Sequence, residues 1–477
     1  MKNHNSIRIH DTASSRSVDL DCSEREVTIY TCGPTVYRDA HIGNMRAYMT
    51  ADLLRRSIAL QGGSVRQVIN ITDVGHLTSD ADSGDDKIEQ SAIEKGVTAW
   101  DVAEEYEAKF WEDFDALGMQ RPEVVAHATA HIEQQIDLIR QLEAGGYTYL
   151  TDDGVYFDSS RYAEYADFAK LDLKGQSAGG RVEMGNKLNQ SDFALWKFPL
   201  GPGKRDMQWD SPWGQGFPGW HIECSAMAIE YLGSRFDIHT GGVDHIPVHH
   251  TNEIAQARAA GHEFADYWLH TAFLLDESGE KMSKSSGASS RVPDVVRDYD
   301  ISLSALRYLY LSHHYQSPLD FGTNKVGQIT AAHARLLDVA AINRQVATQS
   351  RSDLASVAED NPAAQQLWSK FQHSIAQDNL NSPVAIDTLH QVVKSKALSP
   401  SDKDALVEKM DQVLDIGIVK SLGSTAISPA AADLLRRRAS ARSAKDFVVS
   451  DNIRDRLLAH HRLRVIDSPA GQVTRGI

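Results

Sequence analysis

Residues 27–44 read VTIYTCGPTVYRDAHIGN, and this stretch decides how the N-terminal part of the chain folds. Its first residues, Val27 to Tyr30, are typical of a short buried strand. Residues 45–61 are rich in helix formers and are followed by two glycines, which commonly end a helix. Residues 65–71 have the pattern of a second strand. The sequence therefore predicts a strand–helix–strand unit, the building block of a parallel sheet.

The segment His41-Ile42-Gly43-Asn44 lies where that predicted helix begins. A helix N-terminus presents unpaired N–H groups and partial positive charge to an anion. Gly43 lets a bulky ligand approach the backbone closely. A histidine at such a position is also a common helix cap, so the segment by itself leaves both interpretations open.

A second candidate phosphate-binding segment is Lys281-Met282-Ser283-Lys284-Ser285, which follows the strand-like run 272–275. Its two lysines are three residues apart and stand among small residues. Lysines on flexible stems can hold a polyphosphate whose charge moves during a reaction. The alternative is a solvated basic loop.

Four residues far apart in the chain form a candidate metal site. Cys32 and Cys224 are two of only three cysteines, and His249 and Glu253 are four residues apart, so they share one face of a helix. Thiolate, imidazole and carboxylate groups are all ligands of Zn²⁺. On spacing alone, buried core residues are the commoner interpretation of scattered cysteines and histidines.

The composition is that of an ordinary globular enzyme. The chain has 477 residues, enough for three or four domains, with 42% hydrophobic and 24% charged residues. No apolar run approaches the length of a membrane span, and the N-terminal residues lack an apolar signal region. An odd number of cysteines fits a reducing compartment. We therefore expect a cytoplasmic protein without membrane association.

The distribution of charge points to one basic region. The formal net charge of −16 argues against a general nucleic-acid-binding protein. Residues 431–477 differ, because ten Lys or Arg against five Asp give this segment a net charge of +5. A basic helix is most often a solvated face, but an RNA partner of this chain would find its phosphate contacts here.

Changes in residue pattern divide the chain into six expected segments. A nucleotide-binding fold is interrupted by an insertion with a predicted hairpin around Asp152-Asp153-Gly154. The region of residues 281–285 comes next, then a helical region with apolar residues such as Phe371 and Ile375 at helical spacing. Ser421 to Ala430 is an expected linker before the basic C-terminal domain. The expected boundaries are 1–133, 134–215, 216–268, 269–328, 329–425 and 426–477.

The order of these motifs resembles that of the class I aminoacyl-tRNA synthetases, specifically the cysteinyl-tRNA synthetase family. The residues that carry the resemblance are CGPTVYRDAHIGN (32–44), GWHIECSAMA (219–228), FDIHTGGVDHIPVHHTNEIAQ (236–256), KMSKS (281–285), DNLNSP (378–383), and the segments 441–446 and 451–457. The resemblance thus covers nearly the whole chain. The largest departure is the inserted segment Gly75 to Asp85, which we interpret as a solvated acidic loop.

The resemblance implies an α/β fold with a Rossmann-type parallel sheet and an insertion, followed by an α-helical bundle and a small C-terminal anticodon-binding domain. It implies ATP-dependent ligation of L-cysteine to tRNA(Cys) through cysteinyl-adenylate. One Zn²⁺ per chain would select the cysteine thiolate, and Mg²⁺ would accompany ATP. The expected metal ligands are Cys32, Cys224, His249 and Glu253. The implied partners are ATP, L-cysteine and tRNA(Cys), and we expect a monomer.

The resemblance also implies roles for individual residues around one cavity. Those expected to be catalytic, acting on the triphosphate and the leaving pyrophosphate, are His41, Asn44, Lys281 and Lys284. Those expected to bind ATP are His41, Gly43, Gly241, Gly242, Asp244 and Lys284. Those expected to bind cysteine are Cys32, Gly33, Thr35, Thr72, Trp220 and His239.

Two other functions have to be weighed against tRNA ligation. Related enzymes activate cysteine with the same motifs but join it to an amino-sugar, and a regulator could use the fold only for binding. The long chain beyond residue 328 and its basic tail favour a tRNA substrate. The presence of His41, Lys284 and all four metal ligands favours a catalyst.

Overall fold

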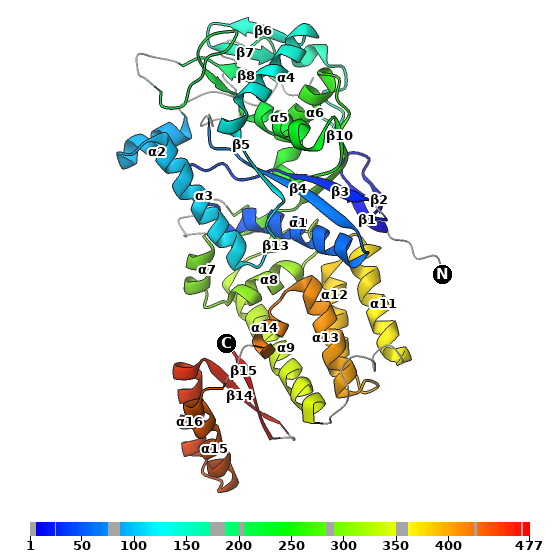
Figure 1. Cartoon of the computed structure of the whole chain (residues 1–477), viewed down its shortest axis with the longest axis vertical. Coiled ribbons are helices and arrows are strands. Elements are labelled where there is room, and N and C mark those ends of the chain that lie inside the picture. Colours follow the sequence, from blue (N-terminus) through cyan, green and yellow to red (C-terminus); the bar gives the residue numbers. More distant parts are fainter. Residues whose placement is uncertain are drawn as a thin grey trace. The chain divides into compact units, whose positions relative to one another are not determined.

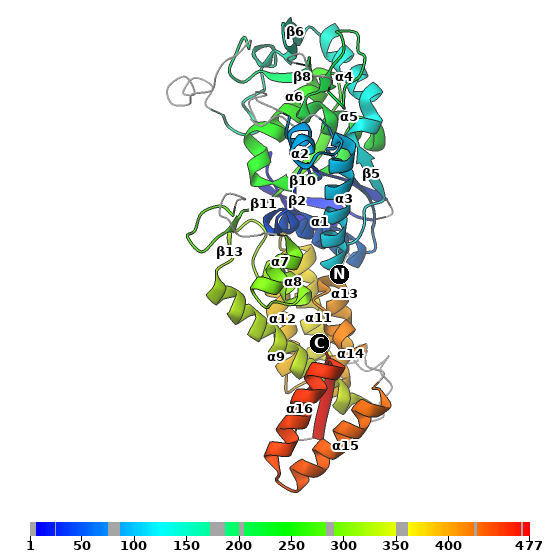
Figure 2. The same ribbon diagram turned by 90° about the vertical axis from the view of Figure 1, so that its left-hand side faces the viewer.

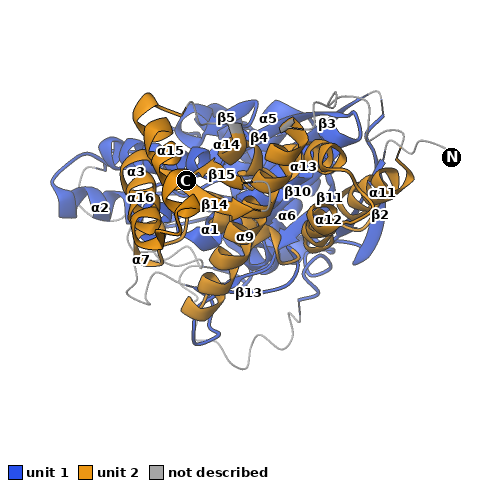
Figure 3. Ribbon diagram, turned by 90° about the horizontal axis from the view of Figure 1, so that it is seen from below, with its two compact units in different colours: residues 1–295, 315–320 blue, residues 296–314, 321–477 orange. Residues whose placement is uncertain are grey.

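The computed structural model describes residues 6–23, 25–74, 86–171, 187–199, 205–282, 291–349, 361–423, 427–468 and 471–477. Lys284 and the acidic segment 75–85 lie outside these residues. The chain forms two compact units, coloured in Figure 3. Unit 1 comprises residues 1–295 and 315–320, and unit 2 comprises residues 296–314 and 321–477.

Unit 1 is built on a five-stranded sheet in which every pairing is parallel. In spatial order its strands are β11 (Phe264–Thr271), β10 (Arg235–Gly242), β3 (Glu26–Thr31), β4 (Ser64–Ile71) and β5 (Val124–His127). The predicted strands at residues 27–30 and 65–71 are confirmed as β3 and β4. Both read as apolar runs because strands of such a sheet are covered on both faces.

Helices cover the two faces of this sheet (Figures 1 and 2). They are α1 (Ile42–Leu60), α2 (Lys87–Lys95), α3 (Ala99–Ala116), α5 (Trp220–Leu232) and α6 (Thr251–Ala259). The figures show α1 on one face and α5 and α6 on the other. This follows from right-handed crossovers, because β3 connects through α1 to β4 on one side, whereas β10 connects through α6 to β11 on the other.

The functional site lies where the crossovers after β3 and β10 turn to opposite faces of the sheet. β3 and β10 are neighbours, and the N–H of Cys32 donates to the carbonyl of Thr240 at 3.2 Å. Their carboxyl ends therefore lie together at the edge of the sheet where open α/β folds bind ligands. Cys32 follows its strand as expected, whereas His239 lies inside β10, paired with Tyr30.

Two further sheet elements belong to unit 1. An antiparallel hairpin of β1 (Ser6–Asp11) and β2 (Arg16–Asp21) was not predicted, because β2 is largely exposed and polar. The strand-like run at residues 272–275 is shorter than expected, since only β12 (Leu274–Leu275) is a strand, paired with β13 (Leu319–Asp320). Helix α7 (Val292–Asp298) crosses the boundary between the two units, which falls after residue 295.

The insertion between β5 and α5 forms an antiparallel sheet of its own in unit 1. After α4 (Ile132–Ala144) come β6 (Thr148–Thr151), β7 (Gly154–Phe157) and β8 (Phe193–Lys197), with β9 (Phe217–Pro218) at the edge. The predicted hairpin around residues 152–154 is confirmed by the β6–β7 pairing.

Unit 2 begins with a helical region. Its helices are α8 (Leu303–Leu311), α9 (Thr323–Gln349), α11 (Pro362–Ala376), α12 (Ser382–Lys394) and α13 (Pro400–Leu414). The predicted apolar faces are buried, since Phe371, Ile375, Leu406, Met410 and Leu414 are all core residues. The helical region was therefore predicted correctly from its periodicity.

The C-terminal part of unit 2 contains α14 (Ile418–Gly423), α15 (Pro429–Ser443), α16 (Phe447–His461) and the antiparallel strands β14 (Leu463–Ser468) and β15 (Gly471–Gly476). The prediction of a linker over residues 421–430 was too long. Residues 421–423 complete α14, and Pro429 begins α15 behind the Ser428 cap, because proline suits the first helical position. None of the helices in the described parts of the chain is both long and apolar enough to span a bilayer.

Candidate active site

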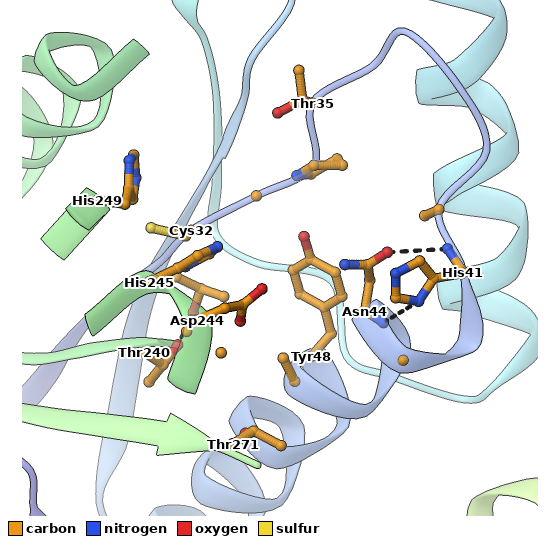
Figure 4. A pocket seen from close by; sticks show the side chains of 18 of the residues that line it. Cys32, Thr35, His41, Asn44, Tyr48, Thr240, Asp244, His245, His249 and Thr271 are labelled. Carbon is orange, nitrogen blue, oxygen red and sulfur yellow. Dashed lines mark hydrogen bonds between the residues drawn. The ribbon is translucent and has the colours of Figure 1, made fainter. Parts of the chain in front are cut away.

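A cavity of about 310 Å³ opens at the carboxyl ends of β3 and β10 (Figure 4). Its lining comes from the turn after β3, the first turns of α1, the end of β10 and the segments after β11 and β12. Buried Arg46 on α1 fixes one wall by donating to the carbonyls of Ala272 and Phe273 at 2.9 and 2.8 Å. The cavity therefore combines segments that are far apart in the sequence.

One end of the cavity holds the predicted metal ligands. The ligand atoms of Cys32, Cys224, His249 and Glu253 all lie within 4.8 Å of one another, and all four residues are buried. Cys32 directly follows β3, and Cys224 lies on α5. The helical segment 246–259 places His249 and Glu253 one turn apart. Nε2 of His249 lies 2.7 Å from Oε1 of Glu253, as their four-residue spacing predicts.

A second group, Cys32, His239, His250 and Glu253, also satisfies the proximity expected of a metal site. The two groups differ in their access to the cavity. Cys32, Cys224 and His249 all line it, whereas His239 and His250 are not among its lining residues. The first group also has two thiols, which suit zinc better than one. The first group is therefore the one that a substrate in the cavity could reach.

The electrostatics of the first group suit a cation. Burial would raise the pKa of Cys224, but a hydrogen bond from Cys32 and the nearby His249 lower it to about 6. Burial would lower the pKa of His249, but Glu253 and Cys224 raise it to about 10. Burial would raise the pKa of Glu253, but His239 and His249 hold it well below its usual range. The protonated ring of His249 thus neutralises the negative charge of Cys224 and Glu253, and a bound metal ion could neutralise it instead.

Unsatisfied polar atoms around this group point the same way. Oε2 of Glu253 and both ring nitrogens of His239 are buried without a well-formed hydrogen bond, although Nε2 of His239 is only 2.7 Å from Oε2. Buried polar groups are rarely left in this state. Glu253 belongs to both groups, whereas His239 belongs to the second. The thiol, imidazole and carboxylate donors of the first group fit Zn²⁺.

Further histidines surround the metal ligands, and sequence analysis did not single them out. Nε2 of His250 lies 3.3 Å from Sγ of Cys32, and Nδ1 of His250 lies 2.7 Å from Nε2 of His270. His221 contacts Nδ1 of His249 at 2.8 Å. Such outer hydrogen bonds orient metal ligands. Their only sequence signals were adjacency to predicted ligands and, for His270, a place near the carboxyl end of β11.

The other end of the cavity is the N-terminus of α1. His41 is the N-cap, and its Nδ1 accepts from the backbone N–H of Asn44 at 3.2 Å, while Oδ1 of Asn44 accepts from the N–H of His41 at 3.1 Å. Both residues are therefore helix caps as well as cavity residues. A Cβ on Gly43 would lie 2.8 Å from the ring of His41, so the glycine admits this ring in addition to any ligand.

The end of β10 supplies the expected nucleotide-binding residues. A Cβ on Gly241 would lie 2.7 Å from the ring of buried His250, so a larger residue there would displace this ring. A Cβ on Gly242 would lie 2.3 Å from the carboxylate of Asp244 and would displace that side chain. Nζ of Lys281 lies 2.8 Å from Oδ2 of Asp244, and both side chains are exposed. Lys281 and Asp244 therefore face each other across the mouth of the cavity.

The expected cysteine-binding residues divide into two sets. Cys32, Gly33, Thr35 and Trp220 line the cavity, whereas Thr72 and His239 lie buried behind it. The Trp220 ring stacks on His249 with centroids 4.3 Å apart. A Cβ on Gly33 would lie 1.5 Å from the carbonyl oxygen of Asn70, so no other residue fits there. Asn70, Tyr48 and His245 also line the cavity and were not anticipated.

The sequence is similar to that of a known family of enzymes. Residues 19–331 match the model of the tRNA synthetases class I (C) catalytic domain. The chain is 45% identical over 455 residues to cysteine–tRNA ligase 1 of Burkholderia lata, covering 94% of this chain and 92% of the relative. It is 38% identical over 481 residues to the cysteine–tRNA ligase of Treponema denticola, covering 95% of this chain and 96% of the relative.

Solved structures share the fold at low sequence identity. The methionyl-tRNA synthetase of Mycobacterium tuberculosis bound by methionyl-adenylate superposes with a TM-score of 0.55 at 15% identity, over 89% of this chain and 96% of that one. A ternary LeuRS–tRNA–LeuAMS complex from Agrobacterium radiobacter K84 gives a TM-score of 0.60 at 13% identity, over 86% of both chains. These similarities extend to the fold alone.

Proposed function

Because the chain belongs to the cysteine–tRNA ligase family of class I aminoacyl-tRNA synthetases, we propose that the cavity at the edge of the parallel sheet is where cysteine is activated by ATP and then joined to tRNA(Cys). The observation that carries this assignment is the arrangement of one cavity. Cys32, Cys224 and His249 line one end of it, and the N-terminus of α1 forms the other. A thiol-bearing amino acid and a triphosphate would thus meet between the two ends.

At the first end, Cys32, Cys224, His249 and Glu253 would hold Zn²⁺. When bound, this ion supplies a soft Lewis acid that takes sulfur as thiolate in preference to an alcohol oxygen. His221 holds His249 through its Nδ1, which leaves Nε2 directed toward Glu253 and the metal position. Trp220 stacks on the same imidazole and limits the orientations of its ring.

At the second end, the capping box sets which atoms meet phosphate. Since Nδ1 of His41 accepts from the Asn44 backbone, a neutral ring carries its proton on Nε2, where it can donate to a phosphate oxygen. Since Oδ1 of Asn44 is engaged, its amide N–H groups are the remaining donors. These donors, with the helix N-terminus, would stabilise the charge that develops when the cysteine carboxylate attacks the α-phosphate.

Lys281 and Asp244 would act on the rest of ATP. Asp244 can accept from the ribose hydroxyls, and Lys281 can hold the pyrophosphate as it leaves with Mg²⁺. Their mutual ion pair is exposed and worth only about 0–1 kcal/mol, so ATP can replace it at small cost. Lys284, which lies outside the described residues, is expected from the sequence to share the pyrophosphate.

The tRNA would use surfaces beyond the cavity. In the C-terminal part of unit 2 four cations, Arg437, Lys445, Arg456 and Arg462, are exposed and form no ion pair within the described residues. Together with the net charge of +5 over residues 431–477, they support an anticodon contact over the expected domain 426–477. We also propose that the enzyme acts in the cytoplasm as a monomer.

The test is cysteine-dependent ATP–pyrophosphate exchange, followed by charging of tRNA(Cys) with labelled cysteine. The wild-type protein should catalyse both, and Cys224→Ser should lose zinc and exchange together. Exchange without charging, with transfer of cysteine to an amino-sugar instead, would overturn the tRNA assignment. The absence of cysteine-dependent exchange would overturn the assignment of the cavity.

A further inference from the structure

His245 lines the cavity, and none of the roles assigned above uses it. It ends the short helical turn η4 (Val243–His245), between Asp244 at the nucleotide end and His249 at the metal end. Figure 4 shows its side chain on the cavity wall beside Cys32 and Asp244. It thus stands where the two halves of a cysteinyl-adenylate would join.

The imidazole of His245 has no hydrogen-bond partner among the described residues. Its Nδ1 is buried, and a Cβ on Gly241 would lie 2.8 Å from it, so this nitrogen is pressed against the backbone of β10. Nε2 is therefore the nitrogen that can face the cavity. A neutral ring with its proton on Nδ1 keeps a lone pair on Nε2, which a group in the cavity can reach.

The distances suit the amino-acid part of the substrate. The His245 ring centroid lies 5.2 Å from that of His249 and 6.4 Å from that of Trp220. A cysteine held through its sulfur at the metal end carries its α-ammonium and α-carboxylate on the second carbon beyond the sulfur. Both groups then come within reach of this stretch of wall. The carboxylate has to turn toward the α-phosphate near His41, so the ammonium needs a different contact.

An acidic side chain would be the usual partner of an ammonium group. The acidic residues that line the cavity within the described chain are Asp39 and Asp244. Asp39 belongs to the turn just before His41, at the phosphate end, where its Oδ1 lies 3.7 Å from Nζ of Lys109. Asp244 is already assigned to the ribose hydroxyls of ATP. A neutral imidazole can offer a lone pair to an ammonium group.

We propose that His245 binds the α-ammonium group of cysteine through Nε2 and so positions the substrate between the metal and the α-phosphate. The inference rests on the proposed function, because it takes cysteine as the ligand of this cavity. It adds a contact to the head group of the substrate, separate from recognition of the sulfur.

The experiment compares the wild-type protein with His245→Leu in pyrophosphate exchange and measures zinc content in both. Two thiols serve as competitive inhibitors: cysteamine, which keeps the ammonium but lacks the carboxylate, and 3-mercaptopropionate, which keeps the carboxylate but lacks the ammonium. His245→Gln retains an acceptor and should recover part of any loss. His262→Leu is the matched control, because Nε2 of His262 contacts Gln141 and the residue does not line the cavity.

We expect His245→Leu to raise KM for cysteine and Ki for cysteamine by about tenfold or more, the loss of one hydrogen bond to a charged group. Its kcat, its Ki for 3-mercaptopropionate and its zinc content should stay near wild type. An unchanged KM, or a loss confined to 3-mercaptopropionate, would overturn the ammonium contact. Loss of zinc would assign His245 a structural role instead. Absence of exchange in the wild-type protein would instead refute the proposed function, and this inference with it.

Discussion

Substitution of Asn44 by aspartate should separate the two roles that this residue combines. In the structure its Oδ1 accepts from the N–H of His41 at 3.1 Å and completes the capping box of α1. Aspartate keeps that acceptor but replaces the amide donor with negative charge. The helix cap should survive, whereas the phosphate site should not. The control Asn44→Ala removes the acceptor and the donor together.

The two variants should differ in the sign of their effect on stability. Asn44→Ala removes the hydrogen bond from the N-cap N–H, and such a bond is worth about 0.5–1.5 kcal/mol; because Asn44 is exposed we expect the lower half of that range to be lost. An acidic residue in the first turn of a helix stabilises it by about 0.3–1 kcal/mol, so Asn44→Asp should be neutral or slightly stabilising. In a unit of this size either change should shift Tm by no more than about 2–4 °C.

Activity should fall in both variants, and further in the stabilised one. Loss of a hydrogen bond to a charged group costs about 1.5–3 kcal/mol, and a carboxylate beside the triphosphate adds repulsion. A total near 3 kcal/mol corresponds to a loss of about 10²-fold in the rate of exchange, with zinc content unchanged. Calorimetry and pyrophosphate exchange measure the two effects. Near-normal exchange by Asn44→Asp would show that Asn44 is only a cap and would refute this account of the phosphate end.

Three further outcomes are expected. Cys224→Ser should lower zinc content, measured by elemental analysis, by about 10-fold or more, and full retention of zinc would contradict the assigned ligand set. Replacing exposed Arg456 and Arg462 by alanine should leave stability unchanged but reduce the salt dependence of tRNA binding by about two charges, whereas Arg438→Ala should destabilise its domain, because that buried guanidinium pairs with Asp467 at 2.9 Å. Serine should be rejected at the adenylate step, because an alcohol is a poorer zinc ligand than a thiolate; rapid serine-dependent exchange followed by hydrolysis of seryl-tRNA would instead reveal editing.

The sequence predicted the structure correctly where interactions between neighbouring residues determine it. β3, α1 and β4 appear where apolar runs, helix formers and glycines predict them, and the apolar periodicity around Phe371 matches buried helix faces. The spacing of His249 and Glu253 foretold a shared face, because four residues make about one turn. Patterns of this kind depend only on the neighbouring residues.

Long-range burial explains most of what was missed. The hairpin of β1 and β2 carries too little apolar alternation to be recognised alone, and it is fixed by contacts such as the 2.9 Å bond from the N–H of Trp268 to Asp11. The expected linker at residues 421–430 proved to be partly helical, because capping by Ser428 starts α15 early.

By itself the sequence determined which chemistry is available: two thiols, an imidazole and a carboxylate, a helix N-terminus behind His41, and a basic C-terminal segment. Only the tertiary structure decided which of these groups act together. It placed Cys32 and Cys224 on one cavity wall, put His239 behind it, and brought His245 onto it with an unpaired ring. It also distinguished two kinds of cation in residues 431–477: Arg438 is buried and paired with Asp467, whereas Arg456 is exposed. The physical reason is that burial and charge pairing depend on residues that are not neighbours in the sequence, such as Arg438 and Asp467 or Cys32 and Cys224, and these residues meet only when the chain has folded.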